Sequence, residues 1–260
     1  MDSSEYLRII DEGEKEELKL FLQSVGEKLP IEVDDREVSF SVPETYELVN
    51  HILTFGMDIL WRKKAAQIAI EGNGQMWMDI CSGTGEMAVY LKQLAPEKTK
   101  VFACDFSFPM IQKAMQKKES SEIIFIVSDI NALPFPDNTF DLVTISFAVR
   151  NINLDRVRFV QALKEINRVL KPGGRFVAVE TSQPKSEIIK KIFHTYIRLA
   201  VKPIGQLISG SKSAYTYLSS TIPRFYPAEE FAEIIKQAGF SEVSFKRLLF
   251  GVTAIHKAVK

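Results

Sequence analysis

Short apolar runs alternate with longer amphipathic segments from Met76 onward, and this alternation limits the folds open to the chain. Apolar runs bounded by turn residues are typical of buried strands, and strands that alternate with helices form an open α/β sheet. The five predicted strands are Met76–Cys81, Lys100–Cys104, Ile123–Val127, Leu142–Phe147 and Arg175–Glu180. The predicted helices include Met87–Leu94, Pro109–Lys117 and Asp155–Leu170. We therefore expect five strand–helix repeats in a mostly parallel sheet with helices on both faces.

The segments on either side of these repeats also have readable patterns. Residues 46–70 have helical periodicity that breaks near Gly56. Near the C-terminus, Gly239 follows a helical stretch in the position of a C-cap. Ser241–Leu248 and Gly251–Val259 then predict two strands joined by a tight turn. We expect this antiparallel hairpin to complete the sheet.

Charge and composition restrict the domain plan and the partners. Residues 1–37 carry 12 acidic and 5 basic side chains, a net charge of −7. We therefore expect an acidic N-terminal extension over residues 1–45, followed by a single domain over residues 46–260. The whole chain has 33 basic and 33 acidic residues, so it lacks the basic field that binds nucleic acid. The longest stretch without charged residues, Ser213–Pro223, is too short to span a bilayer. With two cysteines and no signal peptide, a cytoplasmic protein is expected.

A glycine-rich loop follows the first predicted strand and opens a helix. The run from Asp79 to Ala88 contains Gly83-Thr84-Gly85, and Asp105 closes the second strand 20 residues after Gly85. Glycines let the backbone approach a ligand, and a carboxylate at the end of the second strand accepts hydrogen bonds from ribose hydroxyls. The spacing predicts a nucleotide-binding unit, but the loop alone suits either NAD or S-adenosylmethionine.

Two further carboxylates favour S-adenosylmethionine over NAD. Asp79 ends the first strand, where an acid suits the cationic amino-acid end of S-adenosylmethionine. Asp129 and Ile130 follow the third strand, where a carboxylate and a backbone N–H suit the adenine amino group and ring. The three acids all fall at the carboxyl edge of the sheet, where α/β folds bind ligands.

The chain resembles the ubiquinone/menaquinone biosynthesis C-methyltransferases (UbiE type), a family of class I S-adenosylmethionine-dependent methyltransferases. The resemblance runs from about Tyr46 to the C-terminus. The residues that carry it are Tyr46-Glu-Leu-Val-Asn50, Thr54-Phe-Gly56, Trp61-Arg-Lys63, Ser82-Gly-Thr-Gly85, Leu133-Pro-Phe-Pro-Asp-Asn-Thr-Phe-Asp141, Thr144-Ile-Ser-Phe-Ala-Val-Arg-Asn151, Arg168-Val-Leu-Lys-Pro-Gly-Gly174 and Tyr217-Leu-Ser-Ser. Ser82 and Glu86 depart from the family pattern, which has Gly before Gly83 and often Asp at residue 86.

The resemblance implies a Rossmann-like class I methyltransferase sheet and a set of site residues. The donor S-adenosylmethionine would be bound by Thr84, Asp105, Asp129, Ile130 and Ser146. The loop adds Asp79, Gly83 and Gly85, and the end of the second strand adds Phe106. The acceptor implied is a prenylated quinol. A ring carbon of a quinol is a weak nucleophile until the phenol loses its proton, so the site needs a base or a cation that favours the phenolate. Arg150 is the candidate cation, and Asn151 is the candidate for orienting the quinol oxygen or a water.

The segment 185–225 is expected to cover the acceptor. Residues 188–212 carry Lys190, Lys191, Arg198, Lys202 and Lys212 and no acid, interleaved with apolar residues. The segment is therefore either a packed lid or a peripheral contact with the anionic inner face of a membrane. His51, His194 and His256 are widely separated in the sequence, and no metal site is expected.

Three questions stay open at this level. The acceptor is a prenylated quinol or another small molecule, such as a sterol or polyketide. A non-catalytic protein that binds NAD or another nucleotide would use the same glycines and Asp105. The sequence does not choose between a monomer and a homo-oligomer.

Overall fold

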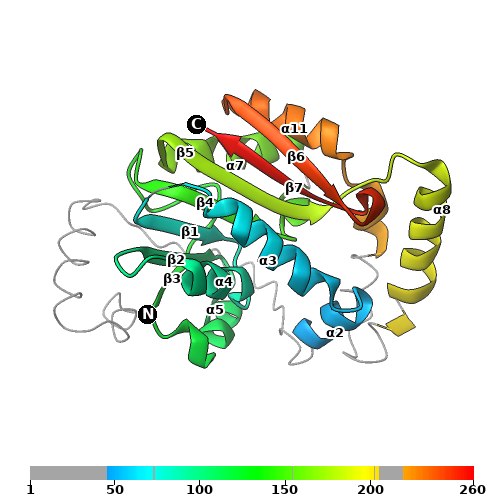
Figure 1. The fold of residues 1–260 in the computed structure, drawn as a ribbon, viewed down its shortest axis with the longest axis horizontal. Coiled ribbons are helices and arrows are strands. Elements are labelled where there is room, and N and C mark those ends of the chain that lie inside the picture. The colour runs from blue at the N-terminus through cyan, green and yellow to red at the C-terminus, as the bar shows by residue number, and fades with distance from the viewer. Residues whose placement is uncertain (1–45, 73, 154, 202, 205–218) are drawn as a thin grey trace.

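The computed structural model describes residues 46–260 except 73, 154, 202 and 205–218. The predicted extension, residues 1–45, lies outside the described residues, as do Tyr217, Lys202 and Lys212. The described part forms a seven-stranded sheet in the order β3-β2-β1-β4-β5-β7-β6 (Figure 1). The strands are β1 Met76–Ile80, β2 Lys100–Asp105, β3 Ile123–Val127, β4 Phe140–Ser146, β5 Leu170–Thr181, β6 Glu242–Leu248 and β7 Thr253–Val259.

Five strands of this sheet are parallel, and β7 runs antiparallel to both of its neighbours, β5 and β6. Because β7 inserts between β5 and β6, the C-terminal strand is interior and β6 forms the edge. The predicted fold class is confirmed. The strand order reverses at β1, since β1 pairs with β2 on one side and with β4 on the other. Such a reversal opens a crevice at the carboxyl ends of the strands, where ligands bind in α/β folds.

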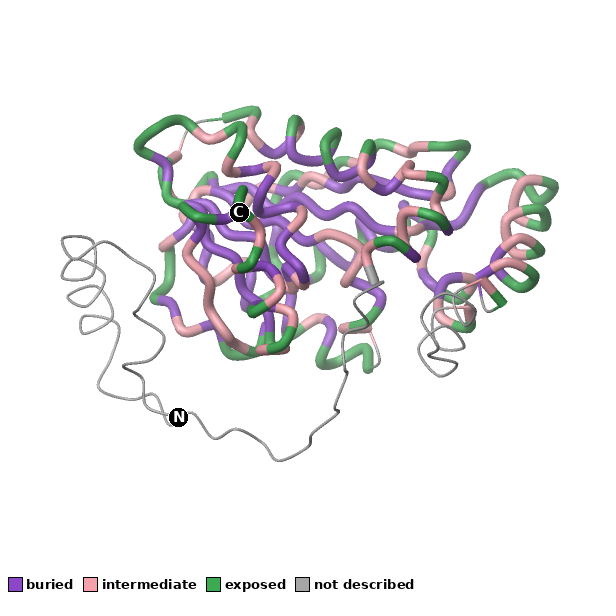
Figure 2. Tube along the Cα trace, turned by 90° about the horizontal axis from the view of Figure 1, so that it is seen from below, coloured by how far each residue is buried: buried purple, intermediate pink, exposed green. Residues whose placement is uncertain are grey.

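Helices cover both faces of the sheet, and each face has its own core. The main helices are α2 Tyr46–Leu53, α3 Met57–Ala69, α4 Glu86–Leu94, α5 Phe108–Met115, α7 Arg156–Val169, α8 Glu187–Tyr196 and α11 Ala228–Gln237. On one face, α3 and α4 pack on a cluster that includes Trp77 and Leu142. On the other, α7 and α11, the latter through Phe231, pack on a cluster that includes Phe102 and Phe176. Figure 2 shows the strands buried between these layers.

Glycine with positive φ marks two of the predicted breaks. Gly56, at φ 73°, separates α2 from α3, and Gly239, at φ 100°, ends the α11 segment. A left-handed backbone is costly for residues with a side chain, so glycine terminates helices well at these points. The predicted break in residues 46–70 and the predicted C-cap are confirmed.

Two expectations about connections are wrong. No helix follows β3: the described residues 128–139 form turns and bends before β4 begins. Pro134 and Pro136 disfavour a helix there. Side chains of α7 satisfy the backbone polar groups of the loop instead: Glu165 accepts from the Leu133 N–H, and Arg168 donates to the Leu133 and Phe135 carbonyls. The final hairpin is joined by the short 3-10 helix Leu249–Gly251 and not by a tight turn.

The helix α8 stands apart from the sheet at one end of the molecule (Figure 1). None of its residues is buried, and a short π-helix, Ile197–Val201, follows it. The α8 residue Tyr196 donates a hydrogen bond to the Leu53 carbonyl of α2, and His194 lies 2.7 Å from Gln183, just after β5. Val49 and Leu53 of α2 pack against Ile197 and Val201 of the π-helix and against Ile222. Within the described residues, no helix is both long and apolar enough to cross a membrane.

Candidate functional site

The glycine-rich loop lies at the carboxyl ends of β1 and β2. It begins at Cys81, whose φ of 49° turns the chain out of β1, and it ends at Gly85, the N-cap of α4, at φ 78°. A Cβ on Gly85 would lie 3.1 Å from the Cβ of Ala114 in α5, so this glycine permits close packing. A Cβ on Gly83, at φ 54°, would meet no atom within 4 Å. The backbone at Gly83 therefore faces open space in which a ligand can approach.

Asp79 is a fully buried carboxyl group at the end of β1. Its Oδ1 accepts a hydrogen bond of 2.7 Å from the Thr144 hydroxyl of β4, and its Oδ2 is buried without a partner among the described residues. Burial raises the pKa of Asp79 to about 7, against the opposing effects of Thr144 and the Arg62 charge, while the Asp105 charge adds to the rise. An unpaired buried oxygen is costly, and a ligand ammonium group would satisfy it.

Asp105 organises the same loop from the end of β2. Its Oδ2 accepts from Gly83 N–H at 2.8 Å, and its Oδ1 accepts from Ser107 N–H at 2.9 Å. Burial raises the pKa of Asp105, and these two N–H groups oppose the rise. Each carboxylate oxygen can accept a second hydrogen bond. The group therefore braces the loop and has the capacity to accept two further hydrogen bonds.

The other predicted donor residues surround this edge with different exposure. Thr84 is buried in the loop, and Ile130 is buried in the core after β3. Phe106, next to Asp105, is 67% exposed, so its ring presents a free apolar surface. Asp129 is exposed and accepts from the backbone and side-chain N–H groups of Asn131, both at 2.9 Å. Ser146 ends β4 and is partly buried.

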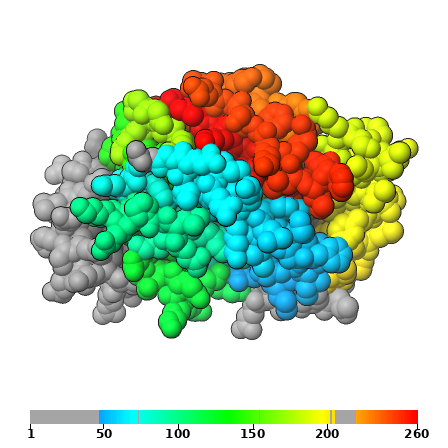
Figure 3. All heavy atoms as spheres, viewed as in Figure 1, coloured from blue at the N-terminus to red at the C-terminus, as the bar shows by residue number. Residues whose placement is uncertain are grey.

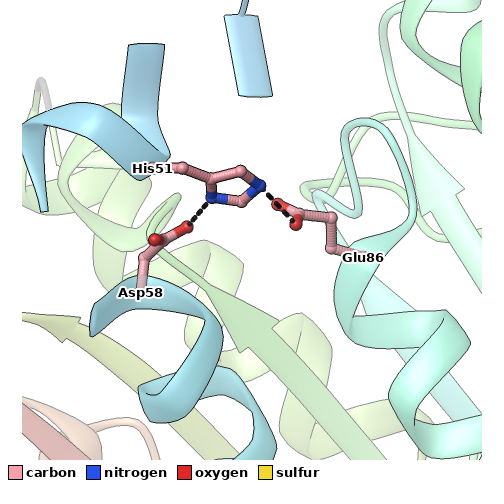
Figure 4. A group of neighbouring side chains, drawn as sticks. All are labelled: His51, Asp58 and Glu86. Atoms are coloured by element: carbon pink, nitrogen blue, oxygen red, sulfur yellow. Dashed lines mark hydrogen bonds and ion pairs between the residues drawn. The ribbon is translucent and has the colours of Figure 1, made fainter. Parts of the chain in front are cut away.

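A charged cluster over the loop was not predicted from the sequence. His51 of α2 places its Nδ1 2.9 Å from Asp58 Oδ2 of α3 and its Nε2 3.5 Å from Glu86 Oε1 of α4 (Figure 4). Arg62 Nη1 lies 2.6 Å from Asp58 Oδ2 and 3.3 Å from Glu86 Oε2. Burial alone would raise the pKa of Asp58, but the Thr54 hydroxyl and Arg62 hold it below its ordinary value.

This cluster has metal-type ligands, but a cation already occupies it. The ligand atoms of His51, Asp58 and Glu86 lie within 4.8 Å of one another. The Arg62 guanidinium sits between both carboxylates, so these oxygens are neutralised by the protein itself. Of these four residues, the sequence analysis singled out Arg62, within Trp61–Lys63, and Glu86, as a departure from the family pattern, and it gave neither a role in a cluster. Only the helix packing brings His51, Asp58 and Arg62 onto Glu86.

Arg150 and Asn151 lie on the short helix α6, Val149–Ile152, directly after β4. Arg150 is buried, and its Nη1 lies 3.4 Å from Glu180 Oε1 and 3.4 Å from the Thr181 hydroxyl. Glu180 Oε2 also accepts from the Arg150 backbone N–H at 3.2 Å. The Nε of Arg150 has no partner among the described residues. Glu180, a positioning partner for Arg150 from β5, was missed because 30 residues separate the two in sequence.

The sheet is parallel over five strands and its order reverses at β1, with carboxylates at the ends of β1 and β2 and a glycine-rich loop between them. This is the fold of the class I methyltransferases. Solved structures share this fold at low identity. A SAM-dependent methyltransferase from Aquifex aeolicus superposes with a TM-score of 0.56 at 18% identity, covering 82% of this chain and 97% of that one. A possible histamine N-methyltransferase from Thermotoga maritima gives a TM-score of 0.59 at 17% identity, covering 84% of this chain and 96% of that one.

The chain belongs to the ubiE/COQ5 methyltransferase family, whose model matches residues 18–260. It is 39% identical to a demethylmenaquinone methyltransferase of Thermus thermophilus, over 81% of this chain and 94% of the relative. It is 36% identical to a ubiquinone/menaquinone biosynthesis C-methyltransferase UbiE of Desulfotalea psychrophila, over 83% of this chain and 85% of the relative. The protein is therefore an S-adenosylmethionine-dependent methyltransferase, as the sequence predicted.

The ionisation of Asp79 should control donor affinity. With its pKa at about 7, Asp79 is largely neutral below that pH and cannot pair with the donor's ammonium group. We expect the affinity for S-adenosylhomocysteine, measured by calorimetry, to fall by up to about tenfold per pH unit below pH 7. Asp79→Asn should bind more weakly and show no such pH dependence. A wild-type affinity that is flat between pH 5.5 and 7.5 would contradict this role for Asp79.

Proposed function

We propose that the protein transfers the methyl group of S-adenosylmethionine to a ring carbon of a prenylated quinol, of the demethylmenaquinol or ubiquinol-precursor type. The observation that carries the proposal is the identity to relatives named for this chemistry, 39% to the Thermus protein and 38% to one from Lactiplantibacillus plantarum over 85% of the chain. An exposed apolar surface on α8 and the residues around it, described below, supports an acceptor with a long apolar tail.

The donor and the protein contribute different parts of the methyl transfer. S-adenosylmethionine supplies an electrophilic methyl group on a sulfonium, and its departing thioether needs no acid. The protein must hold donor and acceptor in line, which is worth roughly 7 to 11 kcal/mol, and must favour the phenolate form of the acceptor. We assign donor binding to Asp79, Gly83, Thr84, Gly85, Asp105, Phe106, Asp129, Ile130 and Ser146.

We assign the acceptor to Arg150 and Asn151. They follow β4, on the other side of the β1 switch point from Asp105. Glu180 orients the Arg150 guanidinium and partly offsets its charge. The remaining N–H groups of Arg150, Nε among them, suit the acceptor oxygen, where they would stabilise the negative charge that develops when the phenol ionises. Asn151 is exposed beside it and suits the same oxygen or a water.

We propose that segment 185–225 covers the acceptor and rests on an anionic membrane surface. The side chains of Ile188, Ile192 and Leu199 are 73%, 65% and 65% exposed and share one face of α8 and the turn after it. Lys190, Lys191 and Arg198 lie in the same segment. Exposed aliphatic side chains beside basic ones are typical of helices that lie in a membrane interface. The enzyme would then be cytoplasmic and peripheral at the inner face of the membrane.

Two exposed phenylalanines that the sequence analysis did not single out add apolar surface, and one of them contacts α8. Phe55, between α2 and α3, is 82% exposed, and its ring centroid lies 6.0 Å from that of Tyr196 in α8. Phe250, after β6, is 77% exposed. Both have positive φ, 53° and 55°, a strained backbone for bulky residues that is found mostly at functional sites. Figure 3 shows α2 in blue, α8 in yellow and the red C-terminal part of the chain at the same end of the molecule.

Membrane contact predicts salt-dependent binding to vesicles. The protein should co-sediment with anionic liposomes at low salt and less at high salt, since each basic residue near the surface contributes about 1 kcal/mol. Replacing Lys190, Lys191 and Arg198 together by Glu should abolish binding. The charge-matched control replaces three exposed lysines elsewhere, Lys98, Lys118 and Lys164, by Glu and should bind normally. No binding at low salt, or equal binding by both triple variants, would leave only a packed lid.

The acceptor itself is tested with purified protein. Incubation with S-adenosylmethionine and reduced demethylmenaquinone should give a product heavier by one methylene, located on a ring carbon by fragmentation in mass spectrometry. A ubiquinol precursor and a quinol without a prenyl tail serve as comparisons. Methylation of a sterol or polyketide in preference to every quinol would replace the acceptor and leave the donor site intact.

A further inference from the structure

The layer of helices on one face of the sheet ends before the edge strand. On that face α3 packs over β5 and β7, and Ile255 of β7 belongs to the core beneath it. In β6, Ser244 and Lys246 are in register with Lys257 and Ile255, so their side chains lie on the α3 face of the sheet, and both are exposed. Among the described residues, the helix that packs on β6 is α11, which covers the opposite face. A groove therefore remains between α3 and β6.

The groove combines apolar contact area with basic side chains. Its volume is about 370 Å³, and its lining includes the buried residue Ile255. Lys64 and Ile68, one helical turn apart, form the wall on α3, and Lys246 contributes to the wall on β6. Leu60, one turn before Lys64 on the same side of α3, is 58% exposed. It extends the apolar strip along α3 toward α2.

The positive charge of the groove is not neutralised by the described part of the protein. Glu71, the acidic residue of the lining, pairs with Lys257 at 3.1 Å. Lys64 and Lys246 are exposed and form no ion pair with any residue that the structure describes. The lining thus carries three lysines and one glutamate, a net charge of +2. Such a groove is complementary to an acidic segment that also has an apolar face.

We propose that residues 11–25 of this chain dock in the groove between α3 and β6. These residues lie outside the described part, and their sequence has both features that the groove requires. Residues 11–17 carry five acids and one lysine. They are followed by four apolar residues with the spacing of one helix face, Leu18, Phe21, Leu22 and Val25. The acids would meet the two unpaired lysines, and the apolar face would cover the isoleucines of the groove.

The length of the connecting chain allows this docking within one molecule. The 20 residues 26–45 separate the proposed segment from α2 and, when extended, span up to about 66 Å. The 13 residues of α3, which follow α2 directly, measure only about 20 Å. A segment tethered in this way has an effective concentration in the millimolar range, which favours its own groove over that of a second copy. The basic helix α8 offers no comparable wall, since none of its residues is buried.

Photo-cross-linking in the full-length protein tests the docking. The residue Phe21 is replaced by p-benzoylphenylalanine, and the cross-linked peptides are identified by mass spectrometry after irradiation. We expect cross-links to residues 60–71 or 244–257, within a product that migrates as a single chain on a denaturing gel. Replacing Lys64 and Lys246 together by Glu should lower the yield by about five- to tenfold, because two attractive charge pairs become repulsive.

A charge swap separates docking from any damage to the fold. Adding Glu16→Lys and Glu17→Lys to the Lys64→Glu, Lys246→Glu variant should restore most of the yield. The matched control replaces two exposed lysines elsewhere, Lys118 and Lys164, by Glu and should cross-link like the wild type. Each variant should bind S-adenosylhomocysteine within about twofold of the wild type, since none of the changed residues belongs to the proposed donor or acceptor site.

Three results would overturn the proposal. They are cross-links to residues 187–201 or to other surfaces in place of the groove, a cross-linked dimer as the main product, and a yield that the Lys64→Glu, Lys246→Glu variant leaves unchanged. Absence of any cross-link from position 21 would count against it equally. The inference goes beyond methyl transfer and does not depend on the acceptor, so failure of the quinol assignment would leave these results unaffected.

Discussion

Replacing Arg150 by glutamine is expected to lower kcat for quinol methylation by about 100-fold or more, with the affinity for S-adenosylhomocysteine changed less than twofold. The reason is that the guanidinium lies after β4, on the other side of the switch point from Asp105, and in the proposed role it stabilises the acceptor oxygen when that oxygen becomes negative. Calorimetry and steady-state rates measure the two quantities. Arg158→Gln, at an exposed arginine of α7, is the matched control and should change neither.

Arg150 forms a buried ion pair with Glu180, so its replacement also affects stability and calls for a double variant. Without Arg150, the buried Glu180 carboxylate loses its charged partner, and an unpaired buried charge costs about 3 to 5 kcal/mol of folding free energy. The double variant Arg150→Gln, Glu180→Gln removes that charge and should recover most of the stability while remaining inactive. Wild-type turnover in either variant, or donor affinity weakened tenfold or more, would show that Arg150 does not serve the acceptor.

Replacing Asp105 by alanine should weaken S-adenosylhomocysteine by about 1 to 3 kcal/mol, roughly 5- to 150-fold. The expected cause is the loss of the acceptor for both ribose hydroxyls. Asp105 also braces Gly83 N–H, so part of the loss could come from a loosened loop. A 2′,3′-dideoxy analogue of the ligand distinguishes the two causes by a double-mutant cycle.

The cycle has a clear expected result. If Asp105 contacts the hydroxyls, the Asp105→Ala variant should bind the dideoxy analogue almost as well as S-adenosylhomocysteine, whereas the wild type should strongly prefer the latter. Additive losses would assign the effect to the loop. Asp137→Ala, at an exposed carboxylate paired with Arg168, controls for the loss of a charge and should have no effect.

Local signals in the sequence were sufficient for the strands and the donor loop. The boundaries of β3 were predicted to the residue, and those of β1 and β2 to within one, because apolar runs and flanking turn residues are local properties. The loop after β3 was misjudged, since its polar groups are satisfied by Glu165 and Arg168 from a helix about thirty residues away. Long-range partners of this kind leave no local pattern.

The sequence by itself determined the fold class, the glycine-rich loop, the acids at the strand ends and the family, because each depends on residue type at short spacing. Only the tertiary structure decided which side chains meet. It placed β7 between β5 and β6, paired Arg150 with Glu180, and brought His51, Asp58 and Arg62 onto Glu86. It also left Asp79 Oδ2 buried without a partner in the part of the chain that the structure describes. The physical reason is that burial and electrostatic contacts depend on how helices pack over the sheet, which periodicity along the chain does not specify.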